Sequence, residues 1–150
     1  MKYTCEININ LPLERVIELF DNPDNLKHWQ PGLQSFEHIS GEPGQPGAKS
    51  RVVFQTGKRR IEMIETIIKR NLPEEFTGSY EAPGVYNIVK NRFVAIDENS
   101  TRYVSDQEFQ MKSFPMKIMG FLMPSAFKKQ SNKYLQQFKT FAESQGRGNY

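Results

Sequence analysis

Residues 7–29 read ININLPLERVIELFDNPDNLKHW, and this stretch decides the fold. Apolar and polar side chains alternate over residues 2–10, and a period of two is typical of a half-buried strand. Over residues 13–20 the apolar side chains recur at helical spacing, and Pro12 stands where a first helical turn tolerates proline. A further short helical segment ends at Trp29, before Pro and Gly break the chain again. We therefore predict one strand followed by two short helices.

Six further strands are predicted between residues 33 and 111, because turn-forming residues separate runs that are rich in β-forming side chains. They are expected at residues 33–40, 48–56, 59–70, 76–81, 85–97 and 100–111. Connections this short join antiparallel neighbours, so we expect the six strands to form a meander.

The last third of the chain returns to helical spacing. An apolar stripe over residues 127–142 predicts an amphipathic helix of about five turns. A shorter helix over residues 114–123 precedes it, with a kink or break at Pro124. Residues 146–150 are expected to form a flexible tail.

This order of elements predicts an α+β protein in which one long C-terminal helix covers a curved, seven-stranded antiparallel sheet. The side chains of a single helix cannot fill the whole interior of a bent sheet. We therefore expect a cavity that opens near the two short helices. The sequence has no repeat, low-complexity block or linker, so residues 1–145 are expected to form a single domain.

Length and composition exclude several classes of protein. The chain has 150 residues, of which 37% are hydrophobic and 12% aromatic, too many for a disordered chain. Its 20 Lys and Arg residues against 17 Asp and Glu leave a net charge of +3, with the densest basic cluster at residues 58–60. Because the basic charge is small and little clustered, we expect no nucleic-acid partner. The sequence lacks a long apolar run and a signal peptide, so we expect no stable membrane insertion and a cytoplasmic location. We expect a monomer or a homodimer.

Residues 7–29 resemble the opening of the SRPBCC superfamily, which includes START-related lipid carriers, polyketide cyclase/dehydrase-like proteins and the birch-pollen allergen fold. The resemblance rests on a strand ending in Ile-x-Ile, a proline-containing helix start and a short helix ending in Leu-x-x-Trp. It continues in Thr-Arg-Tyr-Val at residues 101–104 and in the closing amphipathic helix, so it covers nearly the whole chain. The resemblance implies a helix-grip fold around a ligand cavity. It does not imply one activity, since members bind lipids, cyclise polyketides or assist chaperones.

Few residues have the spacing that metal, phosphate or nucleophilic chemistry requires. His38 has no Cys or His at ligand spacing, which argues against a metal site. The glycines at 41, 44 and 47 lie between two strands, so no helix N-terminus awaits a phosphate. Cys5 is the only cysteine and has no obvious base, which leaves little support for nucleophilic catalysis. We expect no metal and no cofactor.

His28 stands at the end of the second short helix, where the resemblance implies the cavity entrance. It could serve as a general acid or orient a carboxylate ligand. The alternative, which we favour, is an exposed histidine beside Trp29, with the indole plugging the core.

The last predicted strand carries polar residues on the face expected to look inward. This face holds Thr101, Tyr103, Ser105, Gln107 and Phe109. If a two-residue turn precedes the strand, Arg92 lies opposite Ser105 on the same face. A three-residue loop would instead turn Asn91 and Phe93 inward. An inward Arg92 would need a partner or an anionic ligand, and the slightly favoured alternative is that it points to solvent.

Glu62 and Glu65 differ in parity, so one of them must share a face with the apolar residues of the central strand. An inward Glu65 beside Tyr80 or Tyr103 could act as an acid or base with a raised pKa. A solvated Glu65 near a strand bulge is at least as well supported.

Three methionines, Met116, Met119 and Met123, recur at three- and four-residue spacing and would form one stripe on a helix. Flexible thioethers suit a surface that adapts to varied apolar ligands, and the resemblance implies a lid over the cavity at this place. Core packing beneath a kinked helix is the alternative. A third possibility is a membrane-touching patch near Lys117, Lys128 and Lys129, for which the basic density is low.

Together these observations favour a non-catalytic carrier or sensor of a small apolar or amphipathic molecule. The rivals are a cyclase- or dehydratase-like enzyme and a protein-interaction module that uses the methionine-rich patch. The catalytic candidates are Glu65, His28, Tyr103 and Gln107. The residues expected to bind the ligand are Trp29, Phe54, Ile64, Tyr80, Arg92, Tyr103, Ser105, Gln107, Phe109, Met116, Met119 and Met123.

Overall fold

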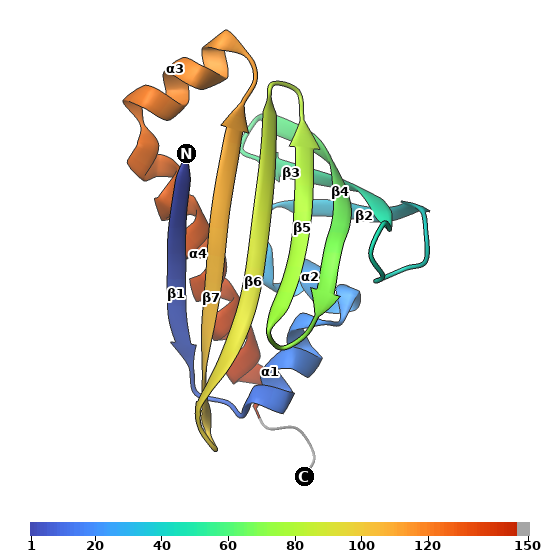
Figure 1. Ribbon diagram of the computed structural model, residues 1–150, viewed down its shortest axis with the longest axis vertical. Helices are drawn as coiled ribbons and strands as arrows, with labels where there is room; N and C mark the ends of the chain where they lie inside the picture. The colour runs from blue at the N-terminus through green and yellow to red at the C-terminus, as the bar shows by residue number, and fades with distance from the viewer. Residues whose placement is uncertain (147–150) are drawn as a thin grey trace.

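Seven strands form one antiparallel sheet that curves around the long C-terminal helix (Figure 1). The computed structural model describes residues 1–146, apart from the side chain of Thr56. The strands are β1 Lys2–Ile9, β2 Leu33–Ser40, β3 Lys49–Thr56, β4 Arg59–Asn71, β5 Glu75–Ala82, β6 Val85–Asp97 and β7 Ser100–Met111, in the spatial order β1-β7-β6-β5-β4-β3-β2. The helices are α1 Leu13–Phe20, the 3-10 turn η1 Pro23–Asn25, α2 Leu26–Trp29, α3 Phe114–Leu122 and α4 Pro124–Gln145. The predicted α+β helix-grip architecture is confirmed.

Different helices lie at the two ends of the sheet. At the lower end β1 runs into α1 and α2, and at the upper end β5 turns into β6 beside α3, with α4 running between the two ends (Figure 1). Gly146 ends α4 by donating its backbone N–H to the carbonyl groups of Ala142 and Glu143. The rest of the expected tail, residues 147–150, lies outside the described residues.

Local capping explains where the short helices begin and end. The Asn22 side chain accepts a hydrogen bond from the backbone N–H of Asp24 at 3.0 Å and so starts η1, as short polar side chains do at helix N-termini. Ser113 caps α3 in the same way through the N–H of Met116. Pro124 is the first residue of α4, where its missing N–H costs nothing. The break between α3 and α4 predicted at Pro124 is therefore present.

The pairing of β6 with β7 decides which side chains face the helix. Residues 98–99 form the two-residue turn, with Asp97 opposite Ser100. Ala95 nevertheless pairs with Thr101, so Ile96 is an extra residue on β6. This bulge shifts the register by one residue.

The bulge turns Arg92 away from the helix. Asn91 lies opposite Ser105 and is buried, while Arg92 lies on the outer face with Asp106 at 3.6 Å from its Nε. Arg92 thus points to solvent, as the slightly favoured alternative had it, and its inclusion among the ligand-binding residues is wrong. The expectation failed because turn length alone does not set the register when a bulge follows the turn.

The hydrophobic core fills the lower half of the space between sheet and helix. Phe20 of α1 lies edge-on to Phe93 and Phe138, with ring centroids 4.8 and 5.8 Å apart. Phe138 is 0% exposed and also packs on Trp29 at 5.0 Å. The buried Thr101 hydroxyl donates to the Leu11 carbonyl at 2.9 Å, which ties the entry to α1 onto β7.

One stripe of α4 faces this core. Its buried residues are Ser131, Leu135, Phe138 and Ala142, at the helical spacing predicted for the last third of the chain. Phe127 lies half-buried on Phe109, with centroids 5.1 Å apart. Phe141, which the same stripe would place against the sheet, instead stacks on the His28 ring beside α2.

Candidate functional site

The candidate site is the part of the concave sheet surface that lies above the core. In antiparallel pairing, residues directly opposite each other project on the same face. Glu65 lies opposite Tyr80, Tyr80 opposite Asn87, and Asn87 opposite Phe109, so one row of side chains crosses β4 to β7. The next row toward the lower end joins Val89 to Gln107. We name as the upper concave face the residues Ile61, Met63, Glu65, Tyr80, Asn87, Val89, Gln107 and Phe109.

Burial differs between the two halves of the concave surface. All eight residues of the upper concave face are half-buried. Farther down the same strands, Asn91, Phe93, Tyr103 and Ser105 are buried. The side chains that should press against α4 are thus accessible in the upper half and packed in the lower half.

Glu65 and Tyr80 form the main polar feature of the upper concave face. The Tyr80 hydroxyl donates a hydrogen bond to the Glu65 carboxyl group. Burial raises the pKa of Glu65 above its usual value, and the hydrogen bond from Tyr80 only partly offsets this effect. Burial, followed by the nearby Glu65 charge, raises the pKa of Tyr80 well above its usual value. The pair therefore combines a phenol that stays protonated with a carboxyl group that holds its proton more readily than a free glutamate.

A second polar chain crosses from β6 to β7. The Asn87 amide donates to the Gln107 side chain at 3.3 Å, and the Gln107 amide donates to the Ser105 hydroxyl at 2.8 Å. Both of the sequence-predicted residues in this chain, Ser105 and Gln107, thus face the helix. Hydrogen bonds within the sheet hold these side chains and fix the orientation of Gln107. The Gln107 amide is not a group that transfers a proton.

Tyr103 belongs to the hydrophobic core. Its hydroxyl donates to the Asn91 side chain at 2.7 Å, and its ring stacks on Phe93 at 4.6 Å. Burial raises the pKa of Tyr103 above its usual value. Trp29 is likewise buried, and its indole nitrogen has no hydrogen-bond partner within residues 1–146.

Aromatic side chains border the upper concave face on both sides. Phe54 of β3 meets Tyr134 of α4 edge-on, with ring centroids 6.4 Å apart. Phe109 stacks on Tyr3 at 6.1 Å, and the Tyr3 hydroxyl shares a 2.7 Å hydrogen bond with Ser131. Burial raises the pKa of Tyr3 to about 12. Phe109 thus belongs to the upper concave face, and Phe54, which is buried, lies opposite Ile61 of that face; that they bind a ligand stays a prediction.

Two other predicted site residues lie elsewhere. Ile64 pairs with Arg51 and Glu81 and shares its face with Glu62, which forms an ion pair with Arg51 on the outer surface. The prediction that Ile64 binds the ligand was wrong, because the side chain of Glu65, the next residue, is the one that points inward. His28 is exposed and stacks on Phe141, with centroids 5.7 Å apart and planes 5° from parallel. It faces an outer groove and not the concave surface.

That groove and a smaller one are open hollows on the outside of the helices. The larger, of about 530 Å³, lies between α2 and α4 and is lined mainly by polar residues: Asn25, His28, Gln137, Thr140, Phe141, Ser144 and Gln145. The smaller, of about 220 Å³, lies between η1, α2 and β2. Neither is lined by any of the residues expected to bind the ligand.

The three methionines of residues 116–123 do not form an inward stripe. None of the residues of α3 is buried. Met116 is half-buried near Gly84, and Met119 and Met123 are 37% and 55% exposed. The expectation that all three line the ligand space is wrong, since the helix rests on the body through Met116 and Gly120 and turns its other residues to solvent.

Asn87 and Met63 of the upper concave face, and Tyr134 on α4, are absent from the residues that the sequence predicts to bind a ligand. The parity of β4 would have found Met63 once Glu65 was taken as inward. Tyr134 also contributes to the raised pKa of Tyr80, which places the two phenols near each other. Only the bulge at Ile96 reveals that Asn87 faces inward, and no sequence signal indicates that bulge.

Two features are absent from the part of the chain that the structure describes. Within residues 1–146, no cluster of three or more His, Cys, Asp or Glu side chains is placed to bind a metal ion. No helix in this part of the chain has the length and hydropathy needed to cross a bilayer.

Solved structures of known proteins share this fold. An aromatase/cyclase from Streptomyces sp. R1128 superposes with a TM-score of 0.81 at 13% identity, covering 99% of this chain and 96% of that one. A protein from Thermus thermophilus gives a TM-score of 0.75 at 18% identity, with 97% and 99% covered. Norcoclaurine synthase from Thalictrum flavum, solved with dopamine and hydroxybenzaldehyde, gives 0.72 at 17% identity, with 99% and 89% covered. At these identities the likeness shows the fold alone.

Sequence comparison identifies the family. No curated protein sequence matches the chain significantly. The model of one family, described as polyketide cyclase / dehydrase and lipid transport, matches residues 1–143. The chain therefore belongs to the polyketide cyclase / dehydrase and lipid transport family, within the SRPBCC superfamily that residues 7–29 resemble.

Proposed function

We propose that the protein binds a small apolar or amphipathic molecule between the upper concave face and α4. The observation that carries this proposal is the difference in burial along the concave surface. Met63, Val89 and Phe109 point toward the helix yet remain half-buried, whereas Phe93 and Tyr103 are buried. Protein interiors are close-packed, so accessible apolar side chains inside a fold indicate space that a ligand can occupy.

The polar groups favour an amphipathic ligand over a pure hydrocarbon. Glu65 is the one acidic side chain on the upper concave face, and no Lys or Arg is among the eight residues of that face. A carboxyl group can make more hydrogen bonds than the one from Tyr80. A ligand with a hydroxyl, amine or carbonyl group at one end would satisfy this pair, while its apolar part contacts Val89 and Met63.

The proposal is tested by filling the space. Val89→Trp places a large side chain on the inner face of β6, while Val94→Trp places it on the outer face of the same strand, where Val94 is 49% exposed. Binding of the polarity-sensitive dye Nile red is measured by fluorescence. We expect Val89→Trp to abolish binding and Val94→Trp to retain it. Equal binding by both variants would contradict the proposal. Native mass spectrometry of the purified wild-type protein then identifies any molecule that it carries.

An enzymatic role is the second candidate, and the Glu65–Tyr80 pair favours it. A carboxyl group with a raised pKa beside a neutral phenol can move a proton to or from a carbonyl compound. The family includes cyclases and dehydrases by its description, and one of the similar structures is an aromatase/cyclase. If the protein is an enzyme, Glu65→Gln and Tyr80→Phe should stop conversion of the carried molecule while Nile red binding persists. A carrier returns the molecule with its mass and structure unchanged.

A further inference from the structure

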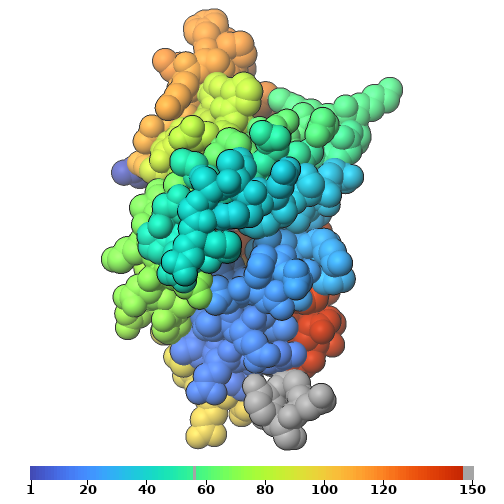
Figure 2. Space-filling model, turned by 90° about the vertical axis from the view of Figure 1, so that its right-hand side faces the viewer, coloured from blue at the N-terminus to red at the C-terminus, as the bar shows by residue number. Residues whose placement is uncertain are grey.

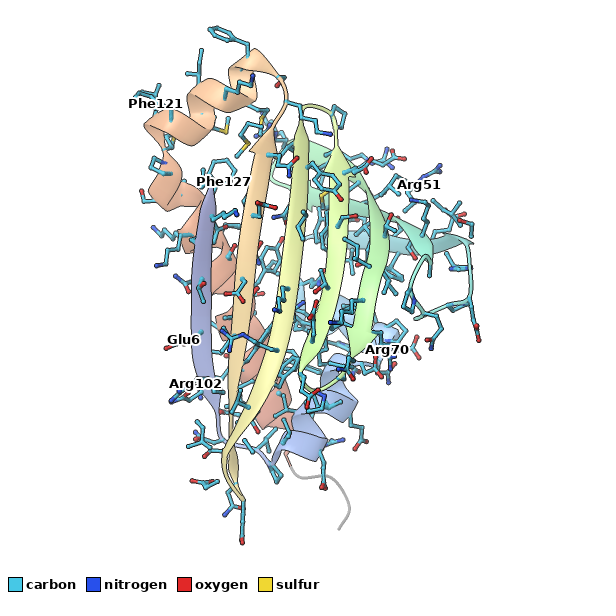
Figure 3. The ribbon with its side chains drawn as sticks, in the orientation of Figure 1. Glu6, Arg51, Arg70, Arg102, Phe121 and Phe127 are labelled. Carbon is cyan, nitrogen blue, oxygen red and sulfur yellow. The ribbon has the colours of Figure 1, made fainter. Side chains whose placement is uncertain are left out.

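The surface of α3 is unusual because its apolar stripe faces solvent. Phe114, Ile118, Phe121 and Leu122 stand at positions i, i+4, i+7 and i+8, the spacing that normally turns one side of a helix to a core. These four side chains are 74%, 42%, 85% and 68% exposed. We call them the exposed stripe. Figure 2 shows α3 standing out at the upper end of the molecule, and Phe121 extends from it away from the sheet (Figure 3).

Lysines are the only charged residues near the exposed stripe in the sequence. Residues 109–142 contain six lysines and no Asp or Glu, although the chain as a whole carries only +3. The rest of the chain accordingly has 14 basic and 17 acidic residues. Of the six, Lys139 is neutralised by Glu143 at 2.7 Å. In the part of the chain that the structure describes, Lys117, Lys128 and Lys129 form no ion pair and are exposed.

We infer that α3 and the first turns of α4 dock reversibly on an anionic lipid surface. A helix that exposes Phe, Ile and Leu and has lysines beside it in the sequence binds at a bilayer interface, because the apolar side chains enter the acyl boundary while the lysines attract anionic headgroups. A hydrophobic protein partner could bind the exposed stripe alone. Such a partner would not explain why residues 109–142 carry only lysines as charged residues while the rest of the chain is net acidic. This docking is peripheral and needs no membrane-spanning segment.

The contacts of α3 make such docking possible without disturbing the core. Gly120 faces Met111 at the end of β7, and Met116 lies beside Gly84 in the turn between β5 and β6. The helix therefore contacts the upper end of the sheet through few residues, next to the upper concave face. Docking there would bring the proposed ligand space close to the lipid surface, but the docking itself does not depend on the proposed ligand.

The experiment measures sedimentation of the full chain with vesicles of phosphatidylcholine alone and of phosphatidylcholine mixed with phosphatidylserine. We expect binding to the mixed vesicles that weakens as salt is raised. Phe121→Ser combined with Leu122→Ser should reduce the partition coefficient at least about tenfold, since each buried apolar side chain contributes that much or more. The triple variant Lys117→Glu, Lys128→Glu, Lys129→Glu should lose about a hundredfold or more, at roughly fivefold per lysine removed from the anionic surface.

Matched controls separate docking from general charge and hydrophobicity. Lys58→Glu, Arg59→Glu, Arg60→Glu reverses the densest basic cluster of the sequence, at the end of the turn between β3 and β4 and the start of β4, which projects away from α3 (Figure 2). Ile39→Ser removes an apolar side chain that is 47% exposed on β2. Both variants should bind the mixed vesicles like the wild type, and circular dichroism verifies that every variant is folded.

A reporter shows whether the stripe itself meets the lipid. Trp29 is buried and is the only tryptophan, so Phe121→Trp adds one exposed indole whose emission should shift to the blue with mixed vesicles. The proposal is overturned if the wild type binds neither vesicle, or if the stripe variants bind as well as the wild type. It is also overturned if light scattering shows a dimer that Phe121→Ser with Leu122→Ser dissociates and vesicles are not bound, since a second copy of the chain would then cover the stripe.

Discussion

The Glu65 carboxyl group is held in the protein with its pKa raised by burial, and this makes folding sensitive to pH. A carboxyl group whose pKa is higher in the folded than in the unfolded state binds more protons when folded. Its contribution to stability is complete below the unfolded pKa and is lost as the pH rises through the folded pKa. Glutamine at this position keeps an acceptor for Tyr80 and cannot ionise.

We therefore expect Glu65→Gln to become more stable relative to the wild type as the pH is raised from acid to neutral. The measurement is the free energy of unfolding in urea across this pH range. Glu62→Gln is the matched control, because Glu62 lies on the outer face in an ion pair with Arg51 at 3.0 Å. A difference between wild type and Glu65→Gln that stays constant with pH would show that Glu65 has an ordinary pKa.

Phe138 and Phe121 show how little the residue type says about the role of a side chain. Both are phenylalanines on the last two helices, yet one is 0% and the other 85% exposed. Phe138→Ala should cost about 3–5 kcal/mol of unfolding free energy, because it leaves a cavity among Phe20, Trp29 and Tyr103. Phe121→Ala should change that free energy by less than about 0.5 kcal/mol. Chemical denaturation of the two variants decides this, and similar costs would mean that α3 is packed in solution.

At the scale of elements, the sequence predicted what depends on periodicity and punctuation. Strand and helix ranges followed from side-chain alternation and from the turn residues between runs. For the inward face of β7, parity within one strand was enough. Which side chains of β6 point inward could not be predicted from the sequence, because one extra residue at Ile96 shifts the register. Tertiary packing decides between a bulged and a regular connection. The orientation of α3 was unpredictable for a related reason, since its sequence is apolar on all sides and only the surrounding structure selects Met116 and Gly120 as the contact.

The two C-terminal helices should differ in local stability. No residue of α3 is buried, and Gly120 lowers the intrinsic stability of this helix, whereas α4 buries Leu135 and Phe138 in the core. We expect the backbone amides of residues 112–123 to exchange with deuterium faster than those of residues 127–142. Hydrogen–deuterium exchange followed by mass spectrometry measures this. Equal protection of both segments would show that α3 is not free to open locally.

Across the whole molecule, the side chains on the lower half of the concave surface are buried, whereas those of the upper concave face are half-buried. We then expect the buried side chains of the lower half to contribute most to the free energy of unfolding, and the upper concave face to bind the proposed ligand. Phe93 and Phe109 test this division, because both are phenylalanines on neighbouring strands and both face α4. Phe93 is 3% exposed and lies 4.8 Å from Phe20, while Phe109 is half-buried between Tyr3 and Phe127.

Phe93→Ala should cost about 3–5 kcal/mol in unfolding free energy, because a packed site cannot collapse fully onto the space left by the ring. Phe109→Ala should cost clearly less, since part of its ring surface is already accessible and less apolar area returns to solvent on unfolding. Nile red binding should respond in the opposite order, with Phe109→Ala changing the affinity and Phe93→Ala, measured where it is folded, leaving it near that of the wild type. Equal costs of the two substitutions would indicate that the upper half is packed as tightly as the lower half, and a ligand would then have no space beneath α4.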